Sequence, residues 1–211
     1  MEGSKNDHIY VIFSNTQGKM GRFIRAMTHG TYNHVSIALN GDLSETYSFA
    51  RLKHDTPFCG GFVREGAERY RTGEHAAQIS VCAIHVGEAG AEKVRGRIKR
   101  MRAHPEAYVY NMLSAMLAPW HMRVSVRDSY TCVEFAVAIL QLAGVRLPGS
   151  VYSAAELYDQ LCDHEVYQGE YPKTASVADQ SYRDRVSIPR RVTSSVKQLG
   201  RLVPRLIEKW E

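Results

Sequence analysis

The segment 33–51, NHVSIALNGDLSETYSFAR, constrains the fold most strongly because it predicts a β-hairpin. Two runs of alternating apolar and polar residues flank Asn40-Gly41-Asp42, and an Asn-Gly pair between such runs is a strong turn signal. The alternation also predicts that one face of the hairpin is buried. A chain that contains such a hairpin needs further strands and a covering layer to bury this face.

Further strands are predicted by alternating, β-branched runs at 8–15, 76–86 and 165–171. Apolar residues recur at helical spacing in other segments, which are 18–28, 88–104, 108–120, 132–144, 153–164 and 194–210. The glycine-containing segment 54–66 predicts a loop with a short strand. Because strands and helices are mixed without a repeating βαβ order, we expect an α+β fold with an antiparallel sheet.

The composition is that of an ordinary globular protein, with 44% hydrophobic and 23% charged residues in a chain of 211. No window approaches 18 uncharged apolar residues, and the N-terminal sequence MEGSKNDHIYVIF lacks the pattern of a secretion signal. We therefore expect a cytoplasmic protein. The widely spaced cysteines predict neither a zinc site nor a disulfide framework, and we expect no metal and no cofactor. These cysteines are Cys59, Cys82, Cys132 and Cys162.

The positive charge is concentrated towards the C-terminus. Residues 181–211 contain eight Lys or Arg and three Asp or Glu, an excess of five that equals the net charge of the chain. We expect residues 1–172 to form the main domain and residues 173–211 to form a linker and a basic amphipathic helix. This helix can pack its apolar face on the domain, or it can contact an anionic membrane surface. We do not expect nucleic acid to be a partner.

The segment SYTCVEFAVAIL (129–140) places Cys132 where an apolar helix begins. Ser129 or Thr131 can cap this helix, which puts the thiol in the first helical turn. The N-terminus of a helix favours a thiolate through its dipole, and its unpaired N–H groups can bind an oxyanion. Cys132 is therefore a candidate nucleophile. The alternative is a cysteine that only packs in the core.

A cysteine nucleophile needs a base, which is usually a histidine held by a third polar group. Among nine histidines, His34 lies on the predicted hairpin, on a strand that should be half-buried. With Asn40-Gly41 as the turn, Glu45 pairs with Ser36, and Tyr47 pairs with His34. The carboxylate of Glu45 would then lie diagonal to His34 and could hold its tautomer. The alternatives are a structural histidine and a solvated glutamate.

The two segments YNHVSIALNGDLSETYSFAR and YTCVEFAVAIL together resemble the circularly permuted papain-like amidases of the NlpC superfamily. That group includes YiiX-like hydrolases and lecithin:retinol acyltransferase-like enzymes. In ordinary papain-like enzymes the cysteine precedes the histidine, whereas here His34 precedes Cys132, as in the permuted members. The resemblance spans about residues 8–170, and its specific part is these two segments.

This resemblance implies a permuted papain-like fold, in which an antiparallel sheet packs against a central helix with the nucleophilic cysteine at its N-terminus. It also implies a thiol hydrolase of the Cys-His-Glu type, with Cys132 as nucleophile, His34 as base and Glu45 as orienting residue. Such an enzyme cleaves an amide or ester bond through a thioester intermediate. The implied substrate is a small peptide, an acyl-amide or a lipid-like molecule.

Three further side chains are candidates for substrate binding. Arg51 could hold a carboxylate, Tyr110 could line a pocket beside the Cys132 helix, and Tyr47 shares the predicted face of His34. A salt bridge or core packing is the alternative for Arg51 and Tyr110. Because the third catalytic position varies in the superfamily, Tyr47 could also replace Glu45. An acyltransferase with the same site and a non-catalytic binding module with the same fold stay open.

Overall fold

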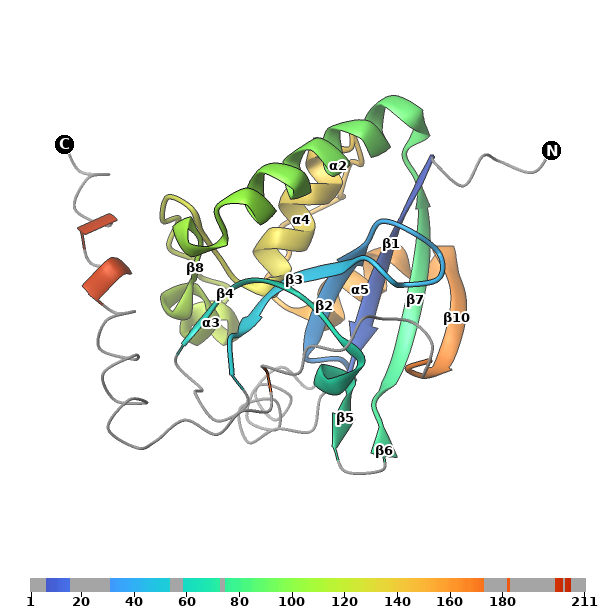
Figure 1. Ribbon diagram of the computed structural model, residues 1–211, viewed down its shortest axis with the longest axis horizontal. Helices are drawn as coiled ribbons and strands as arrows, with labels where there is room; N and C mark the ends of the chain where they lie inside the picture. The colour runs from blue at the N-terminus through green and yellow to red at the C-terminus, as the bar shows by residue number, and fades with distance from the viewer. Residues whose placement is uncertain are drawn as a thin grey trace.

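The computed structural model describes residues 7–15, 31–53, 59–72, 75–172, 182, 200–202 and 204–205. A six-stranded sheet forms its centre, and every neighbouring pair of strands is antiparallel (Figure 1). The strands, in spatial order, are β10 (Glu165–Glu170), β7 (Gln78–His85), β1 (His8–Ser14), β2 (His34–Ala38), β3 (Thr46–Arg51) and β4 (Gly60–Arg64). This confirms the predicted α+β class with an antiparallel sheet.

Two small sheets accompany the main one. The first joins β5 (Arg71–Thr72) to β6 (His75–Ala76), and the second joins β8 (Val109–Tyr110) to β9 (Ser129–Tyr130) in parallel. The α-helices are α2 (Gly87–Ala103), α3 (Met112–Leu117), α4 (Cys132–Leu142) and α5 (Ala154–Leu161). Short 3-10 helices lie at η1 (Ala67–Tyr70), η2 (Pro105–Ala107), η3 (Ala118–Trp120) and η4 (Cys162–His164).

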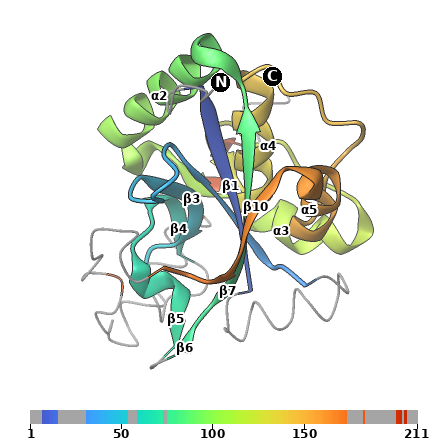
Figure 2. The same cartoon turned by 90° about the vertical axis from the view of Figure 1, so that its right-hand side faces the viewer.

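Strand β1 is central because it is apolar on both faces. Ile9, Val11 and Phe13 pack into the larger core between the sheet and the helices, whereas Ile12 joins a smaller core on the opposite face. Figure 2 shows α4 and α5 on one side of the sheet and the β5–β6 ribbon on the other. Burial on both faces explains why this strand lies inside the sheet rather than at its edge.

Helix α4 packs against β2 and β3. Its first residue, Cys132, lies near the first residue of β2, His34. Its side chains Phe135, Ala136, Ile139 and Leu140 are buried in the larger core. Full burial of one such large apolar side chain stabilises the fold by about 1.5–3 kcal/mol. The predicted helix at 132–144 is therefore confirmed, and apolar packing fixes its position.

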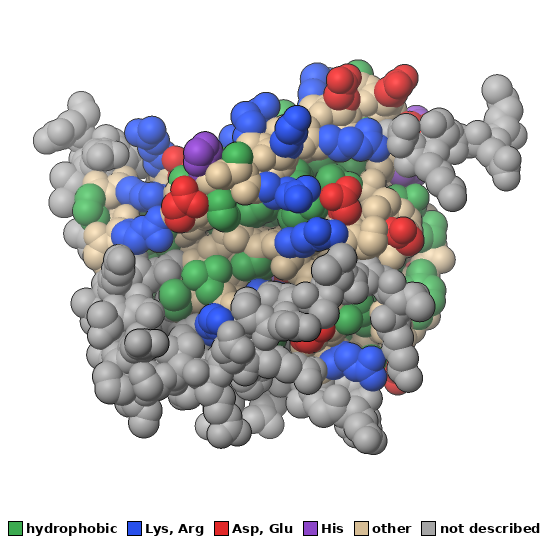
Figure 3. Space-filling model, in the orientation of Figure 1, with side chains coloured by type: hydrophobic (Ala, Val, Ile, Leu, Met, Phe, Trp, Pro, Cys, Tyr) green, Lys and Arg blue, Asp and Glu red, His purple; other side chains and the backbone are tan. Residues whose placement is uncertain are grey.

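Helix α2 confirms the predicted amphipathic helix at 88–104. Ala91, Val94, Ile98 and Met101 are buried, and the basic side chains between them face outwards. Figure 3 shows Lys and Arg side chains gathered along this part of the surface. The helix closes the apolar core and leaves its charges in water.

The predicted hairpin forms, but its predicted register is wrong. Tyr47 pairs with Ile37 rather than with His34, and the N–H of Leu39 donates to the carbonyl of Glu45 (3.1 Å). The connection is a longer loop in which the side chain of Asn40 accepts from the N–H of Glu45, and Leu43 adopts φ 59°. The shift by an odd number of positions moves Glu45 and Tyr47 to the face opposite His34.

The single helix expected at 108–120 is replaced by β8, α3 and η3. The chain turns at Asn111, whose side chain caps α3 by accepting from the N–H of Ser114 (3.2 Å). The side-chain amide of Asn111 also donates to the carbonyl of Val124 (2.8 Å) and to Glu134 (3.3 Å). A buried asparagine with these partners ties α3 to the first turn of α4.

Several expectations lie outside the described residues. These are the helix at 18–28 and most of the linker and final helix at 173–211. In the described part of that segment, Leu202 packs against Val109 and Val126, and Arg205 donates to the carbonyl of Ala107 (3.0 Å). Among the described helices, none combines the length and apolarity needed to cross a membrane.

Candidate active site

Cys132 is the first residue of α4, and a capping box fixes this helix start. The hydroxyl of Thr131 accepts from the N–H of Glu134 (3.1 Å), and the carboxylate of Glu134 accepts from the N–H of Thr131 (2.8 Å). Of the two caps that the sequence allows, Thr131 is therefore the one used, and Ser129 belongs to β9. The cap uses the N–H of Glu134, whereas the N–H groups of Cys132 and Val133 lie in the first helical turn, where the helix itself offers them no acceptor.

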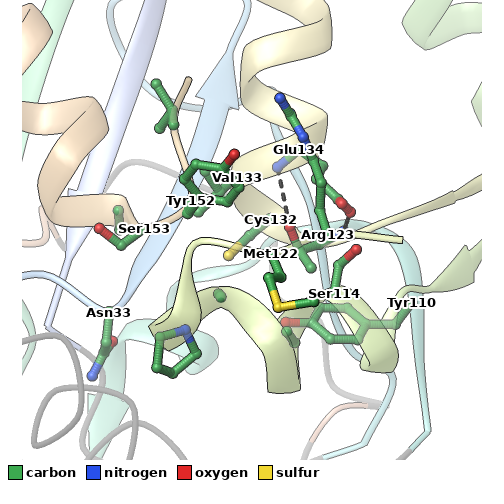
Figure 4. A pocket seen from close by; sticks show the side chains of 16 residues that line it. Asn33, Tyr110, Ser114, Met122, Arg123, Cys132, Val133, Glu134, Tyr152 and Ser153 are labelled. Atoms are coloured by element: carbon green, nitrogen blue, oxygen red, sulfur yellow. Dashed lines mark hydrogen bonds between the residues drawn. The ribbon is translucent and has the colours of Figure 1, made fainter. Parts of the chain in front are cut away.

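The sulfur of Cys132 borders a surface cleft, although the residue is only 8% exposed. Figure 4 shows the sulfur pointing into this cleft, with Asn33 and Ser153 on one side and Met122 and Tyr110 on the other. The remaining lining comes from α3, η3, the segment 151–154 and the start of α4, and it includes the charged side chains of Arg123 and Glu134 beside the apolar ones. The thiol is therefore reachable from the cleft and is not enclosed by the core.

His34 is the first residue of β2, and its imidazole interacts with a carboxylate and with this thiol. The Nε2 atom is 2.7 Å from Oε1 of Glu65, and the Cys132 thiol is near enough to contribute to the raised pKa of the ring. The sequence therefore identified two side chains that the fold does bring together, from segments almost a hundred residues apart.

Glu65 directly follows β4 and holds its buried carboxylate among four donors. The hydroxyl of Ser36 donates to Oε2 (2.6 Å), the hydroxyl of Ser48 donates to Oε1 (2.5 Å), and the Tyr70 hydroxyl also donates to Oε2. The fourth donor is the His34 ring. Only 1% of the Glu65 side chain is exposed, so these bonds replace the water that a buried carboxylate loses.

The electrostatics of this pair favour two opposite charges. Burial alone raises the pKa of Glu65, but the adjacent His34, the positive charge of Arg69 and the hydroxyl of Ser36 outweigh it and lower this pKa to about 2. Burial likewise lowers the pKa of His34, but Glu65 and Cys132 outweigh it and raise this pKa to about 10. At neutral pH the site therefore contains an imidazolium next to a carboxylate.

Of the other predicted site residues, only Tyr110 lines the cleft. Burial, together with the nearby Cys132, raises the pKa of its hydroxyl. Tyr47 is fully buried on the opposite face and stacks on Phe62, with ring centroids 5.8 Å apart. The guanidinium of Arg51 donates to the hydroxyl of Tyr182 (3.4 Å) and does not line the cleft.

Glu45 does not lie beside His34, which corrects the expectation that it orients this ring. Its side chain is 39% exposed, and its carboxylate lies 3.5 Å from the guanidinium of Arg102 and accepts from the hydroxyl of Tyr47 (3.3 Å). The register of the hairpin explains this position, because Glu45 and His34 point to opposite faces of the sheet.

Glu65 is the functional candidate that the sequence reasoning missed. The sequence does contain a signal for a buried polar partner, because polar residues occupy positions on one face of otherwise apolar strands. Ser36 follows His34 by two residues, and Ser48 lies on the neighbouring strand, so a polar patch is built into an otherwise apolar sheet. Such a buried patch needs a charged or polar partner, and Glu65 at the end of the next strand supplies it.

Comparison with protein-family models, with curated proteins and with solved structures found no match to this chain.

Proposed function

We propose that this protein is a cysteine-dependent hydrolase with a circularly permuted papain-like arrangement, in which Cys132 is the nucleophile, His34 the base and Glu65 the orienting residue. The observation that carries the proposal is one imidazole that is hydrogen-bonded to a buried carboxylate and interacts with a thiol at a helix N-terminus. The chain order of His34 before Cys132, and the packing of α4 on an antiparallel sheet, agree with the permuted arrangement.

The proposed reaction starts from a thiolate paired with the His34 imidazolium. The sulfur attacks the carbonyl carbon, a carbon–sulfur bond forms, and the carbonyl electrons move to the oxygen. The N–H groups of Cys132 and Val133 would donate to this oxyanion. The intermediate collapses when the bond to the leaving amine or alcohol breaks, and the imidazolium gives that group its proton.

A thioester on Cys132 then remains. Neutral His34 takes a proton from water, the water oxygen attacks the thioester carbon, and the carbon–sulfur bond breaks to release a carboxylic acid. Glu65 acts throughout by holding the ring and stabilising its positive form. If an amine or alcohol replaces water in this step, the same site is an acyltransferase.

The cleft supports an apolar acyl group as the part of the substrate next to the scissile bond. Ala115, Ala118, Pro119 and Val151 line it, and Met122 lies at its rim with 55% of its surface exposed. This apolar part of the lining favours transfer of hydrocarbon from water, although Arg123 and Glu134 also border the cleft. We therefore propose an acyl-amide or ester with an apolar acyl part as the substrate class.

The experiment that tests the function combines turnover with detection of the intermediate. p-Nitrophenyl acetate and octanoate are offered to the wild type and to the variants Cys132→Ser and His34→Ala, and intact mass spectrometry follows rapid acid quenching. We expect an acyl adduct on Cys132, faster turnover of the octanoate, and loss of both signals in the two variants. Equal turnover by Cys132→Ser would overturn the proposal, and binding without turnover or adduct would indicate the non-catalytic module.

A further inference from the structure

A second cluster of chemically active side chains lies where β1 begins and β7 ends. His8 is paired directly across from His85 in the antiparallel ladder, and their ring centroids are 5.0 Å apart in an edge-to-face arrangement. Asp7 precedes His8 and brings a carboxylate to the same place. None of these three residues takes part in the Cys132 site.

The carboxylate of Asp7 contacts both imidazoles. Its Oδ1 lies 2.6 Å from Nδ1 of His8, and its Oδ2 lies 3.7 Å from Nδ1 of His85. One ligand atom from each of the three residues falls within 4.8 Å of the other two. The side chains are 18% exposed for Asp7, 30% for His8 and 66% for His85, so an ion can reach them from solvent.

We propose that Asp7, His8 and His85 form a binding site for Zn²⁺ or a similar divalent transition-metal ion. Two imidazole nitrogens and one carboxylate oxygen are ligands that Zn²⁺ prefers, with water in the fourth position. Ligands at about 2.0–2.2 Å from a tetrahedral ion lie roughly 3.4 Å from one another. One ligand atom from each of the three residues already lies within 4.8 Å of the other two, so side-chain rotations would bring these atoms to the separation that the ion needs.

The cysteine spacing, which predicts no zinc site, says nothing about this cluster, because its ligands are histidines from two strands. The metal would take the place of the hydrogen bond between Nδ1 of His8 and Oδ1 of Asp7.

The expected effect of the ion is on stability. His34 is paired with Ser14 at the other end of β1, so the two sites are separated by the length of this strand, roughly 20 Å. The carbonyl of Asp7 also accepts from the N–H of Val86 (2.9 Å), directly before α2. An ion at the cluster would fasten the start of β1 to the junction of β7 and α2.

The test uses the full-length protein without an affinity tag. Zn²⁺ binding is measured by calorimetry, and Co²⁺ binding by visible absorption, for the wild type, His8→Ala, His85→Ala and Asp7→Asn. His104→Ala is the matched control, because His104 is also exposed and lies 3.7 Å from a carboxylate, that of Glu106. We expect each cluster variant to lose at least about tenfold in affinity and the control to keep it. Saturating Zn²⁺ should raise the Tm of the wild type by about 5 °C or more.

A second measurement needs no variant. Co²⁺ should broaden or shift the ring-proton resonances of His8 and His85 in the unmodified protein, and EDTA should reverse this change. The proposal is overturned if no ion binds at millimolar concentration, if the cluster variants bind as tightly as wild type, or if Co²⁺ gives the charge-transfer absorption of a thiolate ligand instead. Turnover is not part of this test, so its outcome is independent of the proposed hydrolase.

Discussion

The Nε2 atom of His34 lies 2.7 Å from Oε1 of Glu65, although 31 residues separate these two side chains in the sequence. The contact crosses three strands, because His34 begins β2 and Glu65 follows β4 with β3 between them. The strand β3 contributes Ser48, whose hydroxyl donates to the same carboxylate. The charged pair is therefore held by the sheet itself.

The variant Glu65→Gln should lower kcat/KM of the proposed hydrolase by roughly 10²-fold or more. An amide keeps the shape of the carboxylate but cannot stabilise a positive imidazole, and general acid–base catalysis contributes about this much. Glu45→Gln is the matched control and should stay within about threefold of wild type, because an exposed ion pair is worth little. If Glu45→Gln lowers kcat/KM more than Glu65→Gln does, Glu45 rather than Glu65 is the orienting residue. Circular dichroism checks that both variants fold.

The free energy of unfolding should depend on pH because the charged pair of His34 and Glu65 stabilises the folded state. The pKa of His34 is raised from 6.5 to about 10, so its contribution is complete below pH 6.5 and is lost as the pH rises through 10. The pKa of Glu65 is lowered from 4.5 to about 2, so its contribution is complete above pH 4.5 and is lost as the pH falls through 2. The difference in unfolding free energy between wild type and His34→Gln should therefore be largest between pH 4.5 and 6.5. Urea unfolding at several pH values measures this difference in unfolding free energy. A difference that does not change with pH would contradict a charged pair of His34 and Glu65.

Alkylation by iodoacetamide should distinguish Cys132 from the buried Cys82. Burial, aided by Glu165, raises the pKa of Cys82 to about 12, so this thiol should not react at pH 7. Cys132 should react at pH 7, and His34→Ala should slow it about tenfold or more, because the imidazolium no longer holds the thiolate. Peptide mapping separates both sites from the exposed Cys162. An unchanged rate in His34→Ala would argue that the ring does not act on the sulfur.

Gly60→Ala should disturb the cleft through Tyr110. A Cβ at this position would lie 2.8 Å from the Cβ of Tyr110 and 2.9 Å from the carbonyl oxygen of Ala50, so the backbone or the tyrosine must move. Overpacking of this kind costs about 1–3 kcal/mol of unfolding free energy. We expect a lower Tm and a higher KM for the proposed substrates. Gly149→Ala is the control, since nothing lies within 4 Å of the added atom, and it should change neither value.

The sequence predicted most elements and two members of the site because local patterns determine them. The start of α4 was predicted from a capping Ser129 or Thr131 and an apolar run, and these signals placed Cys132 in the first turn; the structure shows that Thr131 and Glu134 form the cap. The pairing of His34 could not be predicted in the same way. Asn40-Gly41 indicates a two-residue turn, but the side chain of Asn40 and the left-handed Leu43 stabilise a longer loop.

That difference in loop length decides which carboxylate faces the histidine. An odd shift in register reverses the face of every residue on the second strand, and the sequence alone does not fix this shift when both faces are largely buried. The third site residue comes from the following strand, so its position depends on two successive registers. This is the physical reason why the contact between Glu65 and His34 was missed, although Cys132 and His34 were predicted to lie together.

Strand β4 is an edge strand of the six-stranded sheet, and Glu65, the hydrogen-bond partner of His34, directly follows it. An edge strand can unfold locally at a lower free-energy cost than an interior strand. If β4 peels away, five strands stay hydrogen-bonded while the imidazole loses its counter-charge. The proposed activity would then be lost at a lower urea concentration than the far-ultraviolet circular dichroism signal of the sheet. Catalysis would therefore fail through local unfolding of β4, before global unfolding.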